Sequence, residues 1–128
     1  MSHSMRTPLS RARGLGSAKE GVGHFIKQRV TAVALAILVP WFLLSLVFAL
    51  QAGFAGATAW IGHPLNAILL TLLLLTAFYH MRLGLQVVIE DYIPGHLPRA
   101  AALIANTFVC AVLAVASVLS VAKIFVGA

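Results

Sequence analysis

Residues 64–92 read PLNAILLTLLLLTAFYHMRLGLQVVIEDY, and no other stretch of the chain constrains its structure as strongly. The part from residue 64 to residue 89 is mostly apolar and long enough to cross the ~30 Å of hydrocarbon in a bilayer as a helix. His80 lies inside this apolar part, and Asp91 and Tyr92 follow at its end. A histidine within a bilayer is costly and usually has a task, so the stretch predicts both a membrane-spanning helix and a functional site.

Two further apolar segments have the length of a membrane span, at about residues 30–50 and 100–121. The chain is 61% hydrophobic and only 9% charged, and a soluble domain of this size could not bury so much apolar surface. Helices are favoured because they satisfy every backbone group within the span. We therefore predict an all-α membrane protein with three transmembrane helices. Pro40 removes one hydrogen bond from the first helix and should bend it.

The polar composition divides the chain into two parts. Residues 1–22 form a polar, basic N-terminal tail, and residues 23–128 form a three-helix transmembrane anchor domain. Residues 51–63 contain glycine and no formal charge, and we expect them to connect the first two spans. Residues 90–99 contain proline and glycine, which stop one helix before the next begins.

The net charge of +6 is concentrated ahead of the first span, at Arg6, Arg11, Arg13, Lys19, Lys27 and Arg29. A basic flank beside a membrane helix sets its orientation and contacts anionic lipid. No nucleic-acid-binding motif accompanies the charge, so we predict no nucleic-acid partner. The flank places the N-terminus inside and, after three spans, the C-terminus outside. A serine- and arginine-rich, acid-poor tail is also typical of mitochondrial transit peptides.

The polar residues of the second span share one helix face. His80, Gly84 and Asp91 follow each other at helical spacing, and Gly84 leaves room for a planar group such as haem, or for another backbone. Asp91 lies about 16 Å along the axis from His80, at the membrane edge. The phenol of Tyr92 is a suitable donor to a quinone carbonyl. The alternatives are that His80 bonds to a neighbouring helix and that Gly84 is a packing notch.

The other histidines lie outside the spans. His24, His63 and His96 are near membrane edges, and His3 is in the tail. A haem with two axial histidines would therefore need its second ligand from another chain, either a different subunit or a symmetric copy.

Two motifs resemble a known family. The first is QRVTA at residues 28–32, where the first span begins, and the second combines His80, Gly84 and the Asp-Tyr pair at residues 91–92. Together they resemble the small membrane-anchor subunit of succinate dehydrogenase, the succinate:quinone oxidoreductase of respiratory complex II. The resemblance covers nearly the whole chain, including the tail, the three spans and the loop lengths.

The resemblance implies a haem b held between this subunit and a second three-helix anchor of the cytochrome b556 type, the two packing as one helical bundle. His80 would be the axial ligand to the haem iron, and Tyr92 would border the ubiquinone pocket with Asp91 beside it. Arg29 would face a haem propionate or the quinone region, a role that suits its fixed donors. From the residue alone, Arg29 reads equally as an orientation-setting charge.

Succinate oxidation must occur in partner subunits. The chain has no flavin-binding fingerprint, and its one cysteine, Cys110, lies in an apolar run where we expect a buried structural thiol. FAD and the iron–sulfur clusters are thus expected in a flavoprotein subunit and an iron–sulfur subunit. Arg82 and Gln86, also within the second span, receive no assigned role.

Two alternatives stand beside this interpretation. The same parts would serve the anchor of a fumarate reductase, which runs the reaction in the opposite direction. A non-enzymatic assembly protein or small transport protein is the alternative from another class, with His80 as a packing or proton-relay residue. We expect a multi-pass protein of the bacterial inner (cytoplasmic) membrane, with the mitochondrial inner membrane as the second choice.

Overall fold

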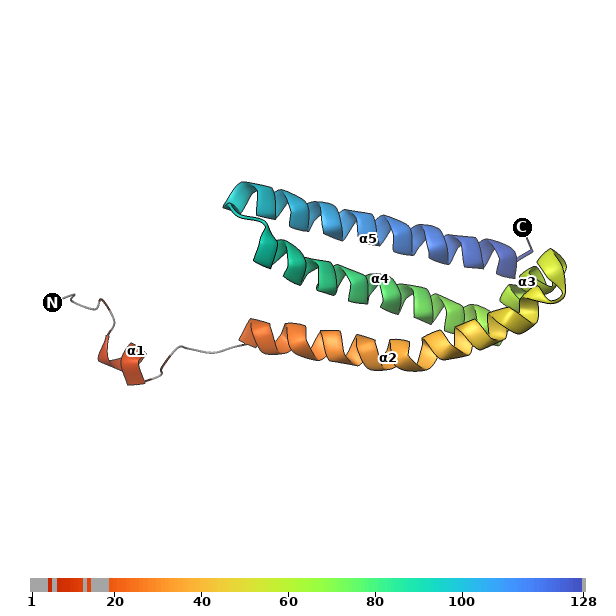
Figure 1. Cartoon of the computed structure of the whole chain (residues 1–128), viewed down its shortest axis with the longest axis horizontal. Helices are drawn as coiled ribbons and strands as arrows, with labels where there is room; N and C mark the ends of the chain where they lie inside the picture. The colour runs from red at the N-terminus through yellow and green to blue at the C-terminus, as the bar shows by residue number, and fades with distance from the viewer. Residues whose placement is uncertain (1–4, 6, 13, 15–18, 128) are drawn as a thin grey trace.

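The computed structural model describes residues 5, 7–12, 14 and 19–127. Every regular element in these residues is a helix, as predicted (Figure 1). The helices are α1 (Pro8–Ala12), α2 (Lys19–Leu50), α3 (Gly53–Gly62), α4 (Pro64–Tyr92) and α5 (His96–Phe125).

Three of these helices are long and apolar enough to cross a membrane: α2 from Glu20 onward, α4 and α5. The expected spans lie inside them, and each helix extends beyond its span. The largest extension is at α2, which begins at Lys19 rather than near residue 30. Hydropathy marks only the part of a helix that suits hydrocarbon, whereas the backbone bonds of a helix continue through residues such as Lys, Glu, Gln and Arg, which are good helix formers.

Residues 51–63 connect the first two spans, and most of them form a further helix, α3, that the sequence did not indicate. Gly53 has a φ angle of +66°, a conformation that residues other than glycine rarely adopt. This conformation turns the chain out of α2. At Gly56 a Cβ atom would contact the Ala52 side chain and lie 2.7 Å from the Ala49 carbonyl oxygen. These two glycines therefore make a tight turn, after which the alanine-rich sequence continues as a helix.

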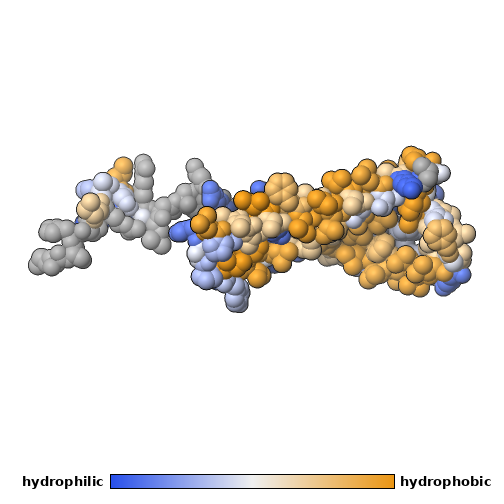
Figure 2. Space-filling view, turned by 90° about the horizontal axis from the view of Figure 1, so that it is seen from above, coloured by the Kyte–Doolittle hydropathy of each residue, from blue (hydrophilic) through white to orange (hydrophobic). Residues whose placement is uncertain are grey.

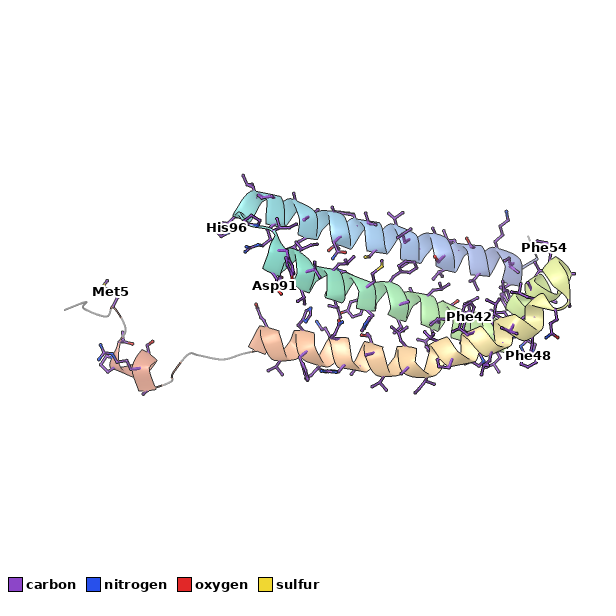
Figure 3. All side chains as sticks on the ribbon, in the orientation of Figure 1. Met5, Phe42, Phe48, Phe54, Asp91 and His96 are labelled. Atoms are coloured by element: carbon purple, nitrogen blue, oxygen red, sulfur yellow. The ribbon has the colours of Figure 1, made fainter. Side chains whose placement is uncertain are left out.

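The long helices form a single layer with α4 in the middle. Helix α4 packs against both α2 and α5, whereas α2 and α5 do not contact each other. Helix α3 covers one end and packs against all three. Asp91 and His96 lie at the other end, where α2 also begins, and Phe48 and Phe54 lie at the α3 end (Figure 3).

The core lies toward the α3 end of the layer. Its buried residues are Leu38, Ala67, Leu70, Leu73 and Val121. Trp41 and Trp60 pack beside it with their ring centroids 5.6 Å apart, so both tryptophans serve packing within this chain. Helix α2 contains Pro40 and changes direction along its length, as the proline predicts (Figure 1).

Most of the apolar surface remains uncovered. Only 6–17% of the most apolar window of each long helix is buried, and apolar residues dominate the face in Figure 2. A layer with both sides exposed needs lipid or other helices against it, because contiguous apolar patches of this size mark membrane or protein contacts.

Candidate functional site

A groove of about 520 Å³ runs between α2 and α4 and contains His80. Its lining residues are Gly21, His24, Phe25, Gln28, Arg29 and Ala32 from α2, and His80, Gly84 and Val87 from α4. The α4 residues follow the helical spacing that the sequence predicted, and the groove brings two predicted site residues, His80 and Arg29, to one place.

His80 is half-buried, and each of its two ring nitrogens faces a side chain of α2. Its Nδ1 lies 2.8 Å from the Thr31 hydroxyl oxygen. Its Nε2 lies 3.5 Å from the Gln28 amide nitrogen, at the outer limit for a hydrogen bond. The alternative that His80 bonds a neighbouring helix is therefore true of Nδ1, while the contact that Nε2 makes with Gln28 is long and weak.

Gly84 lies one helical turn from His80 and opens onto the same groove. A Cβ atom at this position would find only the Gln28 amide nitrogen within 4 Å, at 3.8 Å, which is an ordinary contact. Close packing within this chain therefore does not require a glycine here. The notch leaves free space beside His80 of the kind that a flat ligand, or a helix of another subunit, would fill.

Among the described residues, two polar atoms on α2 are buried beside the groove without a hydrogen-bond partner. They are Nε2 of His24 and Oε1 of Gln28, and both residues line the groove. Leaving a buried polar atom without a hydrogen bond costs about 1–3 kcal/mol, so such atoms are rare in native protein structures. Together with the open notch at Gly84, they fit a site that a polar, flat ligand completes.

His24 and Gln28 line the groove but were not predicted as site residues from the sequence. His24, Gln28 and Thr31 follow one another at spacings of four and three, so they share one face of α2. That spacing was the available signal. It did not indicate which residues of α4 this face would meet.

Arg29 lies at the rim of the groove and is exposed. Its guanidinium carbon is 5.2 Å from the centre of the Phe25 ring, a cation–π distance. The ring supports the side chain while its donors remain available to an anion at the groove mouth.

Asp91 and Tyr92 are not part of the groove. Both lie exposed at the end of α4, and the Tyr92 side chain is 79% exposed (Figure 3). At 1.5 Å per residue, the rise from His80 to Asp91 is about 16 Å, so this chain by itself does not bring the two parts of the predicted site together.

Arg82 belongs to the contact between α4 and α5, on another side of α4. Its Nε donates to the Thr107 hydroxyl at 3.2 Å, and its carbonyl oxygen accepts from the Asn106 amide at 3.0 Å. Cys110 is buried in the same contact, which confirms the expected buried thiol, and its Sγ donates to the Asn106 Oδ1 at 3.4 Å. Gln86 donates to Glu90 along α4 at 2.9 Å.

The comparisons with known proteins identify the family of the chain. The family described as succinate dehydrogenase/fumarate reductase transmembrane subunit matches residues 3–119. The chain therefore belongs to this family of membrane subunits. No solved structure gave a significant match.

The curated relatives narrow the assignment. The chain is 34% identical over 122 residues to the succinate dehydrogenase hydrophobic membrane anchor subunit of Paracoccus denitrificans, covering 95% of this chain and 94% of that protein. It is 37% identical over 106 residues to the subunit of the same description from Rickettsia bellii, covering 82% and 84%. It is accordingly a multi-pass membrane-anchor subunit of a succinate dehydrogenase complex, which rules out a non-enzymatic assembly or transport protein.

Proposed function

We propose that this subunit supplies one axial ligand to haem b and part of the ubiquinone-reduction site of its complex. The observation that supports this most directly is the state of His80. Its Nδ1 is bonded to Thr31, its Nε2 is left without a strong partner, and Nε2 belongs to a side chain that lines an open groove beside the Gly84 notch.

The reaction of the complex passes electrons between two chemistries. In the flavoprotein subunit, succinate loses two electrons and two protons and becomes fumarate. The iron–sulfur subunit conducts the electrons to the membrane, where ubiquinone takes up two electrons and two protons and becomes ubiquinol. Haem b, when bound, supplies a one-electron centre beside this path.

Each site residue of this chain has a role that its chemistry allows. The Nε2 lone pair of His80 is the ligand to the haem iron, and Arg29 at the groove rim contacts a propionate or the quinone region. At the end of α4, the Tyr92 phenol donates a hydrogen bond to a quinone carbonyl, and Asp91 beside it orients a neighbour or relays protons. The exposure of both residues suits a pocket that partner subunits complete.

A second membrane anchor completes the haem site in this proposal. The single layer of α2, α4 and α5 leaves the groove and its flanks open, so another helical subunit packs there and supplies the second axial histidine. The flavoprotein and iron–sulfur subunits then attach at the end that holds Asp91 and the start of α2. The basic flank places this end inside, at the cytoplasmic face of a bacterial inner membrane.

Succinate oxidation is the favoured direction. The family includes transmembrane subunits of fumarate reductases, but the curated relatives named above are succinate dehydrogenase anchors of bacteria. The direction itself is set by the potentials of clusters and quinone, which lie outside this chain.

Replacement of His80 tests the proposal. In the intact complex, His80→Ala should remove or strongly perturb the b-type signal in the reduced-minus-oxidised visible spectrum, because the variant has no imidazole to bind iron. His63→Ala is the matched control, since His63 precedes α4 and does not line the groove. Assembly is checked by succinate oxidation with an artificial soluble acceptor. A wild-type spectrum in assembled His80→Ala complex would eliminate His80 as the ligand.

A further inference from the structure

The hydroxyl group of Thr31 lies within hydrogen-bond distance of three possible partners. Its oxygen is 2.8 Å from the Lys27 carbonyl oxygen, 3.0 Å from the Gln28 carbonyl oxygen and 2.8 Å from His80 Nδ1. The hydroxyl has a single proton, so it can donate to only one side and must accept from the other.

The two backbone carbonyl oxygens favour one direction for that proton. A carbonyl oxygen can only accept, and a threonine inside a helix commonly donates back to the carbonyl four residues earlier. With the Thr31 proton directed to Lys27, the oxygen offers a lone pair to His80, and Nδ1 must be the nitrogen that bears hydrogen. In neutral imidazole the other nitrogen, Nε2, then has the lone pair, whose nearest donor in α2 is the Gln28 amide nitrogen at the long distance of 3.5 Å.

We propose that Thr31 is a positioning residue that fixes the Nδ1–H tautomer of His80 and aims the Nε2 lone pair into the groove. The inference rests on the proposed function, because it assigns a role to the lone pair that haem iron would use. It gives a residue of α2 the role of orienting a haem ligand that belongs to α4. Metal-binding histidines are generally oriented in this way, by a bond from the ring nitrogen that does not face the metal.

The proposal has two measurable consequences. Losing the hydrogen-bond acceptor should weaken haem binding about 10- to 100-fold, the usual effect of losing an outer-shell partner. It should also make the imidazole a poorer electron donor to iron, which favours the ferrous state and shifts the haem midpoint potential to a more positive value. A purely structural role for Thr31 would not predict a shift that follows the hydroxyl group.

The test compares three variants in the full complex, purified in mild detergent. Thr31→Val keeps the shape of the side chain and removes the hydroxyl, and Thr31→Ser keeps the hydroxyl and removes the methyl group. Thr58→Val is the matched control, because Thr58 makes the same bonds to its own helix, to Phe54 and Ala55, and no histidine contact. The readouts are haem transfer to excess haem-free globin, and the midpoint potential from a spectroscopic redox titration.

We expect Thr31→Val to lose haem about 10- to 100-fold more readily and to have the more positive potential, with Thr31→Ser and Thr58→Val close to the wild type. Wild-type values in Thr31→Val, or equal losses in the Val and Ser variants, would overturn the proposal. If Thr31→Val does not assemble, Thr31→Cys, with a much weaker acceptor, takes its place against Thr31→Ser.

The outcome also separates this proposal from the one on which it rests. If His80→Ala loses the b-type signal and Thr31→Val behaves as the wild type, only the role of Thr31 is wrong. If His80→Ala keeps the signal, the haem-ligand assignment itself is wrong, and the tautomer at His80 has no bearing on haem.

Discussion

A single imidazole in α4 joins the two helices that form the groove. His80 contacts Thr31 through Nδ1, and its Nε2 has only a long contact with Gln28, which lines the groove as His80 does. The cost of placing a histidine in an apolar helix is partly offset by that bond, since a buried polar group needs a partner. Nε2 of His24 and Oε1 of Gln28 have no hydrogen-bond partner among the described residues, which supports the proposal that a ligand or a partner subunit completes the groove.

Tyr92 lies at the C-terminal end of α4, and its phenol hydroxyl group can be tested by a single substitution. Tyr92→Phe should lower quinone reductase activity about two- to twelvefold, because a hydrogen bond to the quinone contributes about 0.5–1.5 kcal/mol. Assembly and succinate oxidation with an artificial acceptor should not change, since the side chain is 79% exposed in this chain. The measurement is turnover with a soluble ubiquinone analogue.

The matched control is Tyr79→Phe, which makes the same chemical change within α4, away from its end, where Tyr79 lines a groove toward α5. Unchanged quinone turnover in Tyr92→Phe would remove Tyr92 from the quinone site. An equal loss in both variants would show that the effect is not specific to Tyr92.

At the scale of the helices, the turn from α2 into α3 depends on close contact of the backbone. Gly53 supplies the positive φ, and Gly56 fits against Ala49 and Ala52 with no space for a side chain. The turn brings Trp60 of α3 against Trp41 of α2, so the packing at this end of the layer depends on it. Helix α4 then begins directly after α3, with Pro64 in its first turn.

Gly56→Ala should destabilise the subunit. Replacing a helical glycine by alanine ordinarily gains about 0.5–1 kcal/mol. Here the new Cβ would lie 2.7 Å from the Ala49 carbonyl oxygen, and forcing extra atoms into a packed site costs about 1–3 kcal/mol, so the clash outweighs the gain. Thermal unfolding of the purified complex measures the change as a lower midpoint temperature.

Gly23→Ala in α2 is the control, because nothing lies within 4 Å of its Cβ position. We expect that variant to keep or slightly raise the midpoint temperature. A Gly56→Ala complex as stable as the wild type would show that the α2–α3 turn relaxes without cost.

For the whole molecule, the single-layer arrangement determines which parts share an end. Helix α2 runs along the layer in one direction and α4 runs back in the other. The basic start of α2, Asp91 at the end of α4 and His96 at the start of α5 therefore lie at the same end of the layer (Figures 1 and 3). Helix α3 and the end of α5 lie at the opposite end. The polar end therefore holds the residues proposed for the quinone site, and the apolar sides remain for lipid and a second anchor.

Reporter fusions test the orientation of this layer in the membrane. We expect a reporter that is active only outside the cytoplasm to work at the C-terminus and in the segment between α2 and α4, and to be silent between α4 and α5. The reason is that Arg6, Arg11 and the other basic residues of the N-terminal flank hold that end inside. The reverse pattern would overturn the proposed orientation and place Tyr92 at the outer surface.

Sequence alone determined the properties that depend on composition and on spacing within one helix. The apolar runs predicted the three long helices, because crossing hydrocarbon requires length and apolarity that can be read directly. The 3.6-residue period predicted that His80 and Gly84 would share a face, and both line one groove. The motifs at residues 28–32 and 80–92 also pointed to the family that the comparisons show.

Only the tertiary structure decided which helix faces meet. The pairing of Thr31 with His80 joins positions 49 residues apart, and its register depends on how side chains of α2 and α4 interlock. No periodicity within either helix contains that information. The turn into α3 is also a product of the tertiary structure. The sequence indicates glycines at 53 and 56, but the close contact of Gly56 with the end of α2 appears only in the folded chain. Spacing within a helix is set by local backbone bonds, whereas contacts between helices are set by packing of the whole chain.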